Sequence, residues 1–381
     1  MGATRENAGA GAAAAIIPPS WEKAAESIAR RGSTAPPPIA VICGPKNSGK
    51  STFSRYLINT LLPRYKKVGY LDTDVGQPDF FLPGCLSIHV IDEYISDLMN
   101  WRIKSPDRCY FFGDVSSKRD PQAYLGQVTS LYDYFLEEHY KFNEKEALPL
   151  IINTPGWVKG TGYDLLVEIL KYIGPTHVVQ IRISAESKNL PTGAFWLDGE
   201  DYGLLDLIDI YSARTDFNNQ SVLTRKDAGT LRDRRLFEYF KLCFPSDLDI
   251  KANRDLAFAL ASLCPYEVPF SRIKVKHLHC QVPNTEVFHS LNATIVGLAI
   301  DSGERPLSCT QQCVGLGIVR GIDIKKDRIY VLTPVPIHDL QKVDLLLQGF
   351  IEIPTGFLQV RRCLSPYMAT NVLHKLPVKD V

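Results

Sequence analysis

The segment Gly-Pro-Lys-Asn-Ser-Gly-Lys-Ser at residues 44–51 constrains this chain most, because it matches the phosphate-binding loop pattern G-x-x-x-x-G-K-[ST]. Residues 38–43 predict a short buried strand that ends at the loop, and residues 51–62 have apolar side chains at helical spacing. In this strand–loop–helix arrangement, backbone N–H groups and the start of the helix surround phosphate groups. We expect Lys50 to reach the β- and γ-phosphates of a nucleotide and Ser51 to ligate Mg²⁺. The alternative is a glycine-rich turn without a ligand.

The predicted nucleotide-binding residues form one continuous stretch. They are Gly44, Pro45, Lys46, Asn47, Ser48, Gly49, Lys50, Ser51 and Thr52.

Short apolar segments alternate with longer helical segments after the loop. We expect strands at 68–71, 109–112, 148–153 and 177–183, and helices at 121–140 and 163–173. This alternation predicts an α/β fold with a parallel sheet and helices on both faces. Each strand is followed by a polar or glycine-rich turn, and ligands of such sheets bind beyond the C-terminal ends of the strands. We therefore expect these turns to build one site.

The C-terminal part changes character after Pro265, where Val- and Ile-rich segments begin to alternate with polar residues. We predict three regions: a disordered N-terminus with a short helix (1–37), a P-loop domain (38–266) and a smaller mostly-β domain (267–381). The short helix spans 21–30, with Ser20 as its cap, and is expected to pack on the P-loop domain. The alternative is a lid over the nucleotide base. Residues 192–227 carry weak periodicity and receive no assignment.

The composition excludes several classes of protein. The net charge is +1, so a nucleic-acid partner would have to be held by a local basic patch. No apolar run is long enough to span a bilayer, so we expect no membrane partner. The nine cysteines are scattered, and this spacing favours reduced thiols in an intracellular compartment and no zinc site.

Two carboxylates follow the second predicted strand. Asp72 and Asp74 are two residues apart, so in an extended segment both could face the phosphates. One carboxylate can then hold Mg²⁺, while the other accepts a proton from an attacking hydroxyl group. Aspartate is also common in turns at strand ends, so a structural turn is the alternative.

Residues 231–244 predict a basic helix. Arg232 and Arg235 are three residues apart and share one helix face, where their guanidinium groups could cover a phosphoryl group during transfer. The alternative is a solvated face with Asp233 and Glu238 as counter-ions.

The turn after the strand at 148–153 reads Thr-Pro-Gly-Trp-Val-Lys. Gly156 permits close approach of a ligand, Trp157 offers a flat surface to a base or sugar, and Lys159 could meet a phosphate. A buried tryptophan at a turn is the alternative.

Three basic residues near the start of the C-terminal part, Arg272, Lys274 and Lys276, alternate with apolar residues. They are expected on one face of a strand. That face is either a stripe that follows a nucleic-acid backbone or a solvated outer surface.

Taken together and in this order, the loop, the aspartate pair, the Thr-Pro-Gly-Trp turn and the arginine helix resemble the polynucleotide 5′-hydroxyl kinase family over residues 39–244. The family includes an RNA kinase of pre-mRNA cleavage and tRNA splicing and a nucleolar kinase of ribosomal-RNA processing. The sequences of the loop and of the segment Asp-Val-Gly-Gln-Pro at 74–78 are similar to those of the nucleolar branch. The large N-terminal domain found in much of the family is not expected here.

The resemblance implies transfer of the γ-phosphate of ATP, with Mg²⁺, to the 5′-hydroxyl end of RNA or DNA. It implies that Lys50 and Ser51 bind ATP and Mg²⁺, and that Asp74 is both metal ligand and general base, with Asp72 as second carboxylate. It further implies a lid made by Arg232 and Arg235. The implied substrate-binding residues are Gln77, Thr154, Gly156, Trp157 and Lys159.

The resemblance also implies an RNA endonuclease partner and a nuclear, nucleolar location. From the residues themselves two other functions stay open. One is an ATP-bound structural subunit of an RNA-processing complex without turnover. The other is a small-molecule P-loop kinase or an ATPase that is switched by a partner.

Overall fold

The computed structural model describes residues 16–30, 36–99, 103–140, 147–197, 205–213, 228–301 and 311–358. All contacts reported below concern these residues. The disorder predicted for the first residues of the chain lies outside them, except at its C-terminal end, where α1 begins (Pro19–Ala29).

Five parallel strands carry the phosphate loop. They are β1 (Ile39–Cys43), β2 (Val68–Asp72), β5 (Leu150–Asn153), β6 (His177–Arg182) and β7 (Asp206–Tyr211), in the spatial order β7-β6-β1-β5-β2. Strands β1, β2, β5 and β6 are buried on both faces. This burial explains their continuous apolar sequences, and the prediction of these four strands is confirmed.

Two antiparallel strands extend this sheet, so the prediction of a purely parallel sheet was incomplete. Strand β3 (Cys85–Ile91) pairs with β2, and β4 (Arg108–Phe111) pairs with β3. The sequence analysis missed β3 because Ser87 and His89 interrupt its apolar pattern. Both are buried, and Ser87 Oγ lies 2.9 Å from His89 Nε2, which gives each side chain one polar partner inside the sheet.

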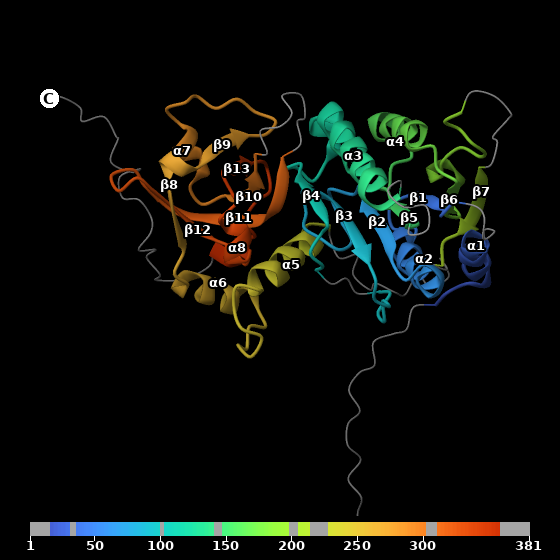
Figure 1. The fold of residues 1–381 in the computed structure, drawn as a ribbon, viewed down its shortest axis with the longest axis horizontal. Coiled ribbons are helices and arrows are strands. Elements are labelled where there is room, and N and C mark those ends of the chain that lie inside the picture. The colour runs from blue at the N-terminus through green and yellow to red at the C-terminus, as the bar shows by residue number, and fades with distance from the viewer. Residues whose placement is uncertain are drawn as a thin grey trace, which may run out of the picture.

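Helices cover both faces of the sheet, which confirms the α/β class (Figure 1). Alternate residues of β1 divide between the faces: Val41 packs with α3 (Pro121–Phe135) and α4 (Gly160–Ile173), and Ile42 packs with α1 and α2 (Lys50–Tyr65). The helix predicted at 121–140 is α-helical only to Phe135 and continues as a π-helical turn, Leu136–Tyr140.

The short N-terminal helix is present, but Ser20 does not cap it. Helix α1 begins at Pro19, and Pro18 precedes it as the capping residue without a side-chain hydrogen bond. Proline suits the first helical position because its missing N–H would have no partner there. The prediction that this helix packs on the P-loop part is confirmed by the burial of Trp21, Ala25 and Ile28.

The C-terminal part is rich in strands, as predicted. Its strands are β8 (Tyr266–Pro269), β9 (Lys274–His277), β10 (Ile295–Ile300), β11 (Gln312–Asp323), β12 (Arg328–Leu332) and β13 (Leu345–Gln348). Short helices α7 (Val287–Leu291), α8 (Ile337–Leu340) and α9 (Thr355–Leu358) accompany them. Strand β11 pairs with β4 through Gln312 and Tyr110, so the described strands of both parts belong to one sheet. The exact division into domains stays a prediction.

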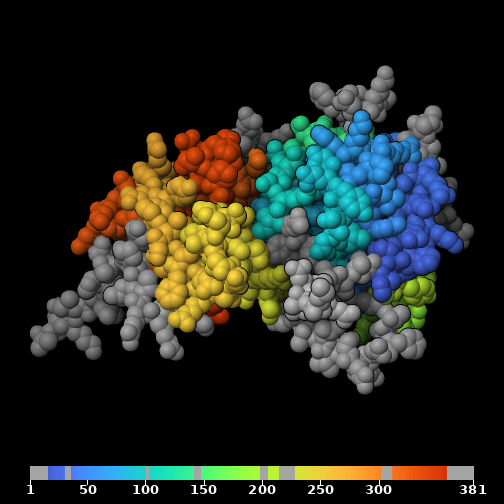
Figure 2. Space-filling model, turned by 90° about the horizontal axis from the view of Figure 1, so that it is seen from below, coloured from blue at the N-terminus to red at the C-terminus, as the bar shows by residue number. Residues whose placement is uncertain are grey.

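Two helices bridge the two parts. Helix α5 (Ala228–Lys241) lies below the sheet, between the C-terminal strands and β3 and β4, and α6 (Asn253–Ser262) follows it (Figure 1). In Figure 2 the yellow residues of this region meet the cyan residues of the P-loop part. Tyr239 fixes α5 to β11, because its hydroxyl donates to Leu316 O at 3.1 Å and accepts from Leu316 N at 2.9 Å. The arginine-rich helix is therefore anchored on the C-terminal strands.

Within the part of the chain that the structure describes, every helix falls short of the length and apolarity that crossing a membrane requires.

Candidate active site

The phosphate loop leaves β1 at Gly44 and enters α2 at Gly49. Gly44 has φ 140° and lies against the carbonyl of Ile181, which leaves no space for a side chain. Gly49 has φ 103° and precedes the first residue of α2. These two glycines let the loop turn back over the helix start, which is the arrangement that presents backbone N–H groups to an anion.

Lys50 is folded into this loop. Its Nζ donates to Gly44 O at 3.0 Å and to Pro45 O at 2.9 Å. Burial lowers the pKa of Lys50 to about 8, and the nearby charge of Asp74 partly opposes this shift. The loop therefore holds a buried cation that an anionic ligand would stabilise.

A cavity of about 680 Å³ lies over the loop and gathers most of the predicted site residues. Its lining residues come mainly from the turns after β1, β2, β4, β5 and β7, from the N-terminal helix α1 and the residues before it, and from α2 and α5. The predicted residues among them are Lys46, Asn47, Ser48, Gly49, Lys50, Ser51, Thr52, Asp74, Gln77, Thr154, Gly156, Trp157 and Arg232. The turns at the C-terminal edge of the sheet thus build one site. The turn after β6 was expected to take part but does not line the cavity, whereas the turn after β7, which was not predicted, does.

Asp74 is held at the wall of the cavity by its own turn. Its Oδ1 accepts from the backbone N of Gly76 and of Gln77, both at 3.0 Å. Gly76 allows this turn to lie against the loop after β4, because a Cβ atom there would come within 2.9 Å of Val115 O. The carboxylate is therefore oriented before any ligand binds.

Asp72 does not line the cavity, contrary to the expectation that both carboxylates face it. Its side chain is fully buried and accepts from Asp74 N and Asn153 Nδ2, both at 3.2 Å, and from Asp79 N. Strand β2 ends at Asp72, so the alternation rule no longer applies to Asp74. Burial, together with the charge of Asp79, raises the pKa of Asp72 to about 7. Asp72 thus fixes the backbone that carries Asp74.

A buried ion pair ties this turn to α2, and the sequence analysis missed it. Arg55 Nε donates to Asp79 Oδ2 at 3.1 Å, and Arg55 Nη2 pairs with Asp79 Oδ1. The hydroxyl of Tyr70 donates to the same carboxylate at 3.2 Å. The available signal was an arginine that shares a side of α2 with the apolar Ile58, three residues later, since a charge among apolar residues usually has a buried partner.

The two predicted lid arginines share a face of α5 but have different surroundings. Arg232 lines the cavity. Arg235 is buried, and burial lowers its pKa while the carboxylates of Asp79, Asp72 and, more weakly, Asp74 oppose this shift. Arg235 therefore lies within electrostatic range of the buried carboxylates that support the Asp74 turn.

The turn after β5 packs directly on the phosphate loop. A Cβ atom on Gly156 would lie 2.5 Å from Lys46 N, so the two backbones are in contact there. Trp157 is half-buried and packs edge-to-face on Tyr124, with ring centroids 5.3 Å apart. Thr154 Oγ1 donates to Ile42 O at 2.9 Å, which holds the turn to β1.

Lys159 does not reach the cavity. It is exposed and precedes the first residue of α4, and it lies outside the lining residues. Helix α4 starts one residue later and directs the chain away from the turn.

Trp21 lines the cavity, although its helix was expected to pack on the P-loop domain, with a lid over the nucleotide base as the alternative. Its Nε1 donates to Tyr211 O at 2.8 Å, and its ring lies edge-to-face with Phe53 at 5.4 Å. The end of the indole lies beside Gly49, where a Cβ atom would be 2.8 Å from it. The apolar spacing around Trp21 indicated a helix that packs on the domain. It did not indicate that β7, which lies in the segment without an assignment, holds α1 beside the phosphate loop.

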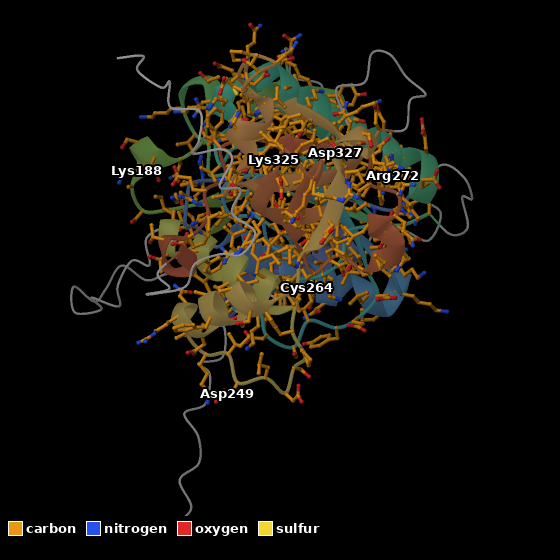
Figure 3. All side chains as sticks on the ribbon, turned by 90° about the vertical axis from the view of Figure 1, so that its left-hand side faces the viewer. Lys188, Asp249, Cys264, Arg272, Lys325 and Asp327 are labelled. Carbon is orange, nitrogen blue, oxygen red and sulfur yellow. The ribbon has the colours of Figure 1, made fainter. Side chains whose placement is uncertain are left out.

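The three basic residues of the C-terminal part alternate with apolar residues, but only Lys274 and Lys276 lie on a strand, β9. Arg272 ends the 3₁₀ helix Phe270–Arg272 before that strand, so the prediction that all three share one strand face was wrong for Arg272. Arg272, Lys274 and Lys276 are exposed while Ile273 is buried, and Figure 3 shows Arg272 on the outer surface. Lys274 Nζ pairs with Asp301 Oδ2 at 2.9 Å. A role in nucleic-acid binding stays a prediction.

The oxygen atoms on the cavity wall suit Mg²⁺ together with phosphate. Ser51 and Asp74 both line the cavity and offer hydroxyl and carboxylate oxygens, which are the ligands that Mg²⁺ prefers. Among the described residues there is no group of three or more His, Cys, Asp or Glu side chains placed to hold a metal by themselves. Mg²⁺ commonly takes one or two protein oxygens and completes its shell with phosphate and water.

Sequence comparisons give two family matches. Residues 44–241 match the family described as mRNA cleavage and polyadenylation factor CLP1 P-loop, and residues 261–354 match the NOL9-like C-terminal domain. The chain is 53% identical over 362 residues to the polynucleotide 5′-hydroxyl-kinase NOL9 of Arabidopsis thaliana, covering 94% of this chain and 97% of that protein. It is 31% identical to the Homo sapiens protein of the same name, covering 89% of this chain and 53% of the human protein.

Structure comparisons agree on the fold. Two solved structures of Clp1p–Pcf11p complexes align over 87% of this chain, with TM-scores of 0.61 and 0.60. They cover 79% and 78% of those chains, at 17% and 15% sequence identity. At such identity the likeness concerns the fold alone.

Proposed function

We propose how this cavity works from one premise: the chain belongs to the polynucleotide 5′-hydroxyl kinase family. The match over residues 44–241 and the Arabidopsis relative confirm the resemblance predicted from the four motifs. The chain is a phosphotransferase that uses ATP and acts on the 5′-hydroxyl end of a polynucleotide. One observation carries this function: Lys50, Asp74, Trp157 and Arg232, which come from four separate motifs, line a single cavity.

The donor phosphates lie on the loop. The backbone N–H groups of residues 46–52 and the start of α2 hold them, and Lys50 moves from the carbonyls of Gly44 and Pro45 to the β- and γ-phosphates. Ser51 and Asp74 would hold Mg²⁺, which would neutralise phosphate charge during transfer.

Asp74 acts on the acceptor. The two backbone N–H groups on its Oδ1 fix the carboxylate, which orients the 5′-hydroxyl group and accepts its proton as the oxygen attacks the γ-phosphorus. Gln77, from the same turn, contacts the incoming end. Asp72 acts through Asp74, as a positioning residue that holds the turn.

The arginines of α5 and the tryptophan turn complete the site. Arg232 covers the transferring group and stabilises its spread negative charge, while Arg235 orients α5 through the buried carboxylates. Trp157 stacks on the terminal nucleoside, with Thr154 and Gly156 fixing its turn to the loop. Lys159, exposed beside this turn, meets a phosphate further along the strand.

We infer RNA as the substrate and ribosomal-RNA processing in the nucleolus as the setting. The NOL9 relatives and the NOL9-like C-terminal match support this inference. An RNA endonuclease is the partner that the chemistry calls for, because cleavage that leaves a 5′-hydroxyl end creates the substrate of this reaction.

Label transfer tests the function. Purified protein, [γ-³²P]ATP and Mg²⁺ are incubated with 5′-hydroxyl RNA or DNA oligonucleotides of the same sequence, and label on the 5′ end is measured. We expect transfer to RNA, and loss of transfer in a folded Lys50→Ala variant. Absence of transfer to both oligonucleotides by a protein that binds ATP would refute the proposal and favour the structural subunit. Thermal protection by metabolites but not by oligonucleotides would favour a small-molecule kinase.

A further inference from the structure

The phosphate loop divides the wall of the cavity into two sides. Strands β5, β2, β3 and β4 follow β1 on one side, and β6 and β7 lie on the other. Asp74 and Trp157, which we assign to the acceptor, come from the turns after β2 and β5. The γ-phosphate of the donor therefore faces that side. The nucleoside at the other end of the triphosphate must leave the loop toward β7.

The wall on the β7 side is built by the N-terminal helix and the end of β7. Ile16, Trp21, Ser212 and Ala213 line the cavity there. Trp21 is only 1% exposed, and three contacts fix its ring: the bond to Tyr211 O, the edge of Phe53 and the backbone at Gly49. The indole thus forms a rigid apolar wall directly beside the first turn of α2.

Ile16 gives this wall an uncovered apolar surface. Its side chain is 81% exposed, although it lines the cavity. An exposed aliphatic side chain at the mouth of a binding cavity gains free energy when a flat apolar group covers it. The ring of a nucleobase is such a group, and its connection to the phosphates places it on this side.

We propose that Ile16, Trp21 and Ala213 form the subsite for the base of the phosphate donor. This inference rests on the proposed function, because it takes the ligand to be a nucleoside triphosphate. It assigns to the N-terminal helix the role of holding the base, in addition to its packing on α2 and β7. The helix is thus both a packed element and part of the nucleotide site.

The chemistry of the subsite also sets its specificity. Among the four described residues of this wall, only Trp21 and Ser212 have polar side-chain groups, and Trp21 Nε1 already donates to Tyr211 O at 2.8 Å. Discrimination between bases needs several placed donors and acceptors, whereas apolar contact accepts any purine. We therefore expect ATP and GTP to bind with affinities that differ by less than about tenfold.

The test compares ATP with inorganic tripolyphosphate, which has the phosphates but no base. Calorimetry on the full chain measures both ligands for the wild type, Ile16→Ala and Ile16→Asp, with Ile337→Ala as the control. Ile337 is also strongly exposed, at 57%, but belongs to α8 in the C-terminal part. Because Ile16 is exposed without ligand, its variants should fold normally.

We expect Ile16→Ala to weaken ATP binding about fivefold to tenfold and Ile16→Asp to weaken it further. Tripolyphosphate binding should change less than about twofold in both variants, and Ile337→Ala should change neither ligand. Equal ATP affinity in wild type and both Ile16 variants would overturn the subsite, as would equal loss for ATP and tripolyphosphate. Selective loss of ATP binding in a protein without label transfer would uphold the subsite while refuting the kinase function.

Discussion

The buried pair of Arg55 and Asp79 offers a quantitative test of how the acceptor turn is held. Its side chains are 6% and 1% exposed, so solvent screens the pair very little. Asp79→Ala leaves the Arg55 guanidinium buried beside the carbonyl of Leu98, to which Arg55 Nη1 donates at 2.9 Å, and also removes the acceptor of the Tyr70 hydroxyl. Breaking a buried pair in this way costs about 3–5 kcal/mol of unfolding free energy.

A double-mutant cycle separates the pair from other effects of the substitution. Arg55→Met should cost about as much as Asp79→Ala, because it leaves the carboxylate buried. If the two residues act as a pair, the double variant should be at least about 2 kcal/mol more stable than the sum of the single effects predicts. Urea denaturation, followed by far-UV circular dichroism and tryptophan fluorescence, gives the free energies when both signals coincide.

Glu93→Ala is the matched control for this cycle. Glu93 pairs with Lys104 at 3.4 Å, but its side chain is 79% exposed. Removal of such a surface pair should change the unfolding free energy by less than about 1 kcal/mol. A cost of Asp79→Ala no larger than that of Glu93→Ala, or purely additive effects in the cycle, would refute the view that this pair anchors the turn.

Three further outcomes follow from the site. Since burial lowers the pKa of Lys50 to about 8 and phosphates favour its charged form, ATP binding should take up a proton near pH 8 and weaken as the pH rises. Calorimetry in two buffers with different ionisation enthalpies measures this proton uptake. The Lys50→Arg variant should show no such uptake. Gly156→Ala would place a methyl group against the backbone of the phosphate loop and should weaken ATP binding at least about tenfold. Gly126→Ala is the control, because its added Cβ atom would have no neighbouring atom within 4 Å, and it should leave ATP binding unchanged. Unchanged binding in both variants would contradict the contact between Gly156 and the loop. Arg232→Ala should lower kcat about 100-fold, because Arg232 lines the cavity. Arg234 is exposed on the same helix, so Arg234→Ala should lower kcat less than about twofold. An equal loss of kcat in both variants would indicate a general charge effect.

Local sequence was sufficient for the phosphate loop and its flanking elements. A fully buried strand has an apolar sequence, and the loop between β1 and α2 has glycine at two of its three positions with positive φ, Gly44 and Gly49, and asparagine at the third, Asn47. The rule that parallel strands present their C-terminal ends at one edge then brought the Asp74, Trp157 and phosphate-loop turns together in the prediction. Each of these inferences uses residues that are close in sequence or a rule that is common to all such sheets.

The missed features all depend on pairing between distant residues. Strand β7 is an edge strand in which most side chains are exposed, so its apolar signal is weak, and its position follows from pairing with β6. Without β7, no sequence pattern places Trp21 beside Gly49. Asp79 likewise has no distinguishing sequence pattern around it, and its role follows from its pairing with Arg55 of α2.

The arrangement of charges explains why folding of this region should depend on its ligand. The raised pKa of Asp72 means that its contribution to stability is lost as the pH rises through about 7, and the lowered pKa of Lys50 means that its contribution is lost as the pH falls through about 8. Between these values both groups reduce stability. Phosphate on the loop favours the charged form of Lys50, so binding offsets part of this cost and stabilises the folded protein by mass action. Without a nucleotide, this region is thus least stable between about pH 7 and pH 8, because Lys50 of the loop and Asp72, which positions the Asp74 turn, are then both charged and kept away from water.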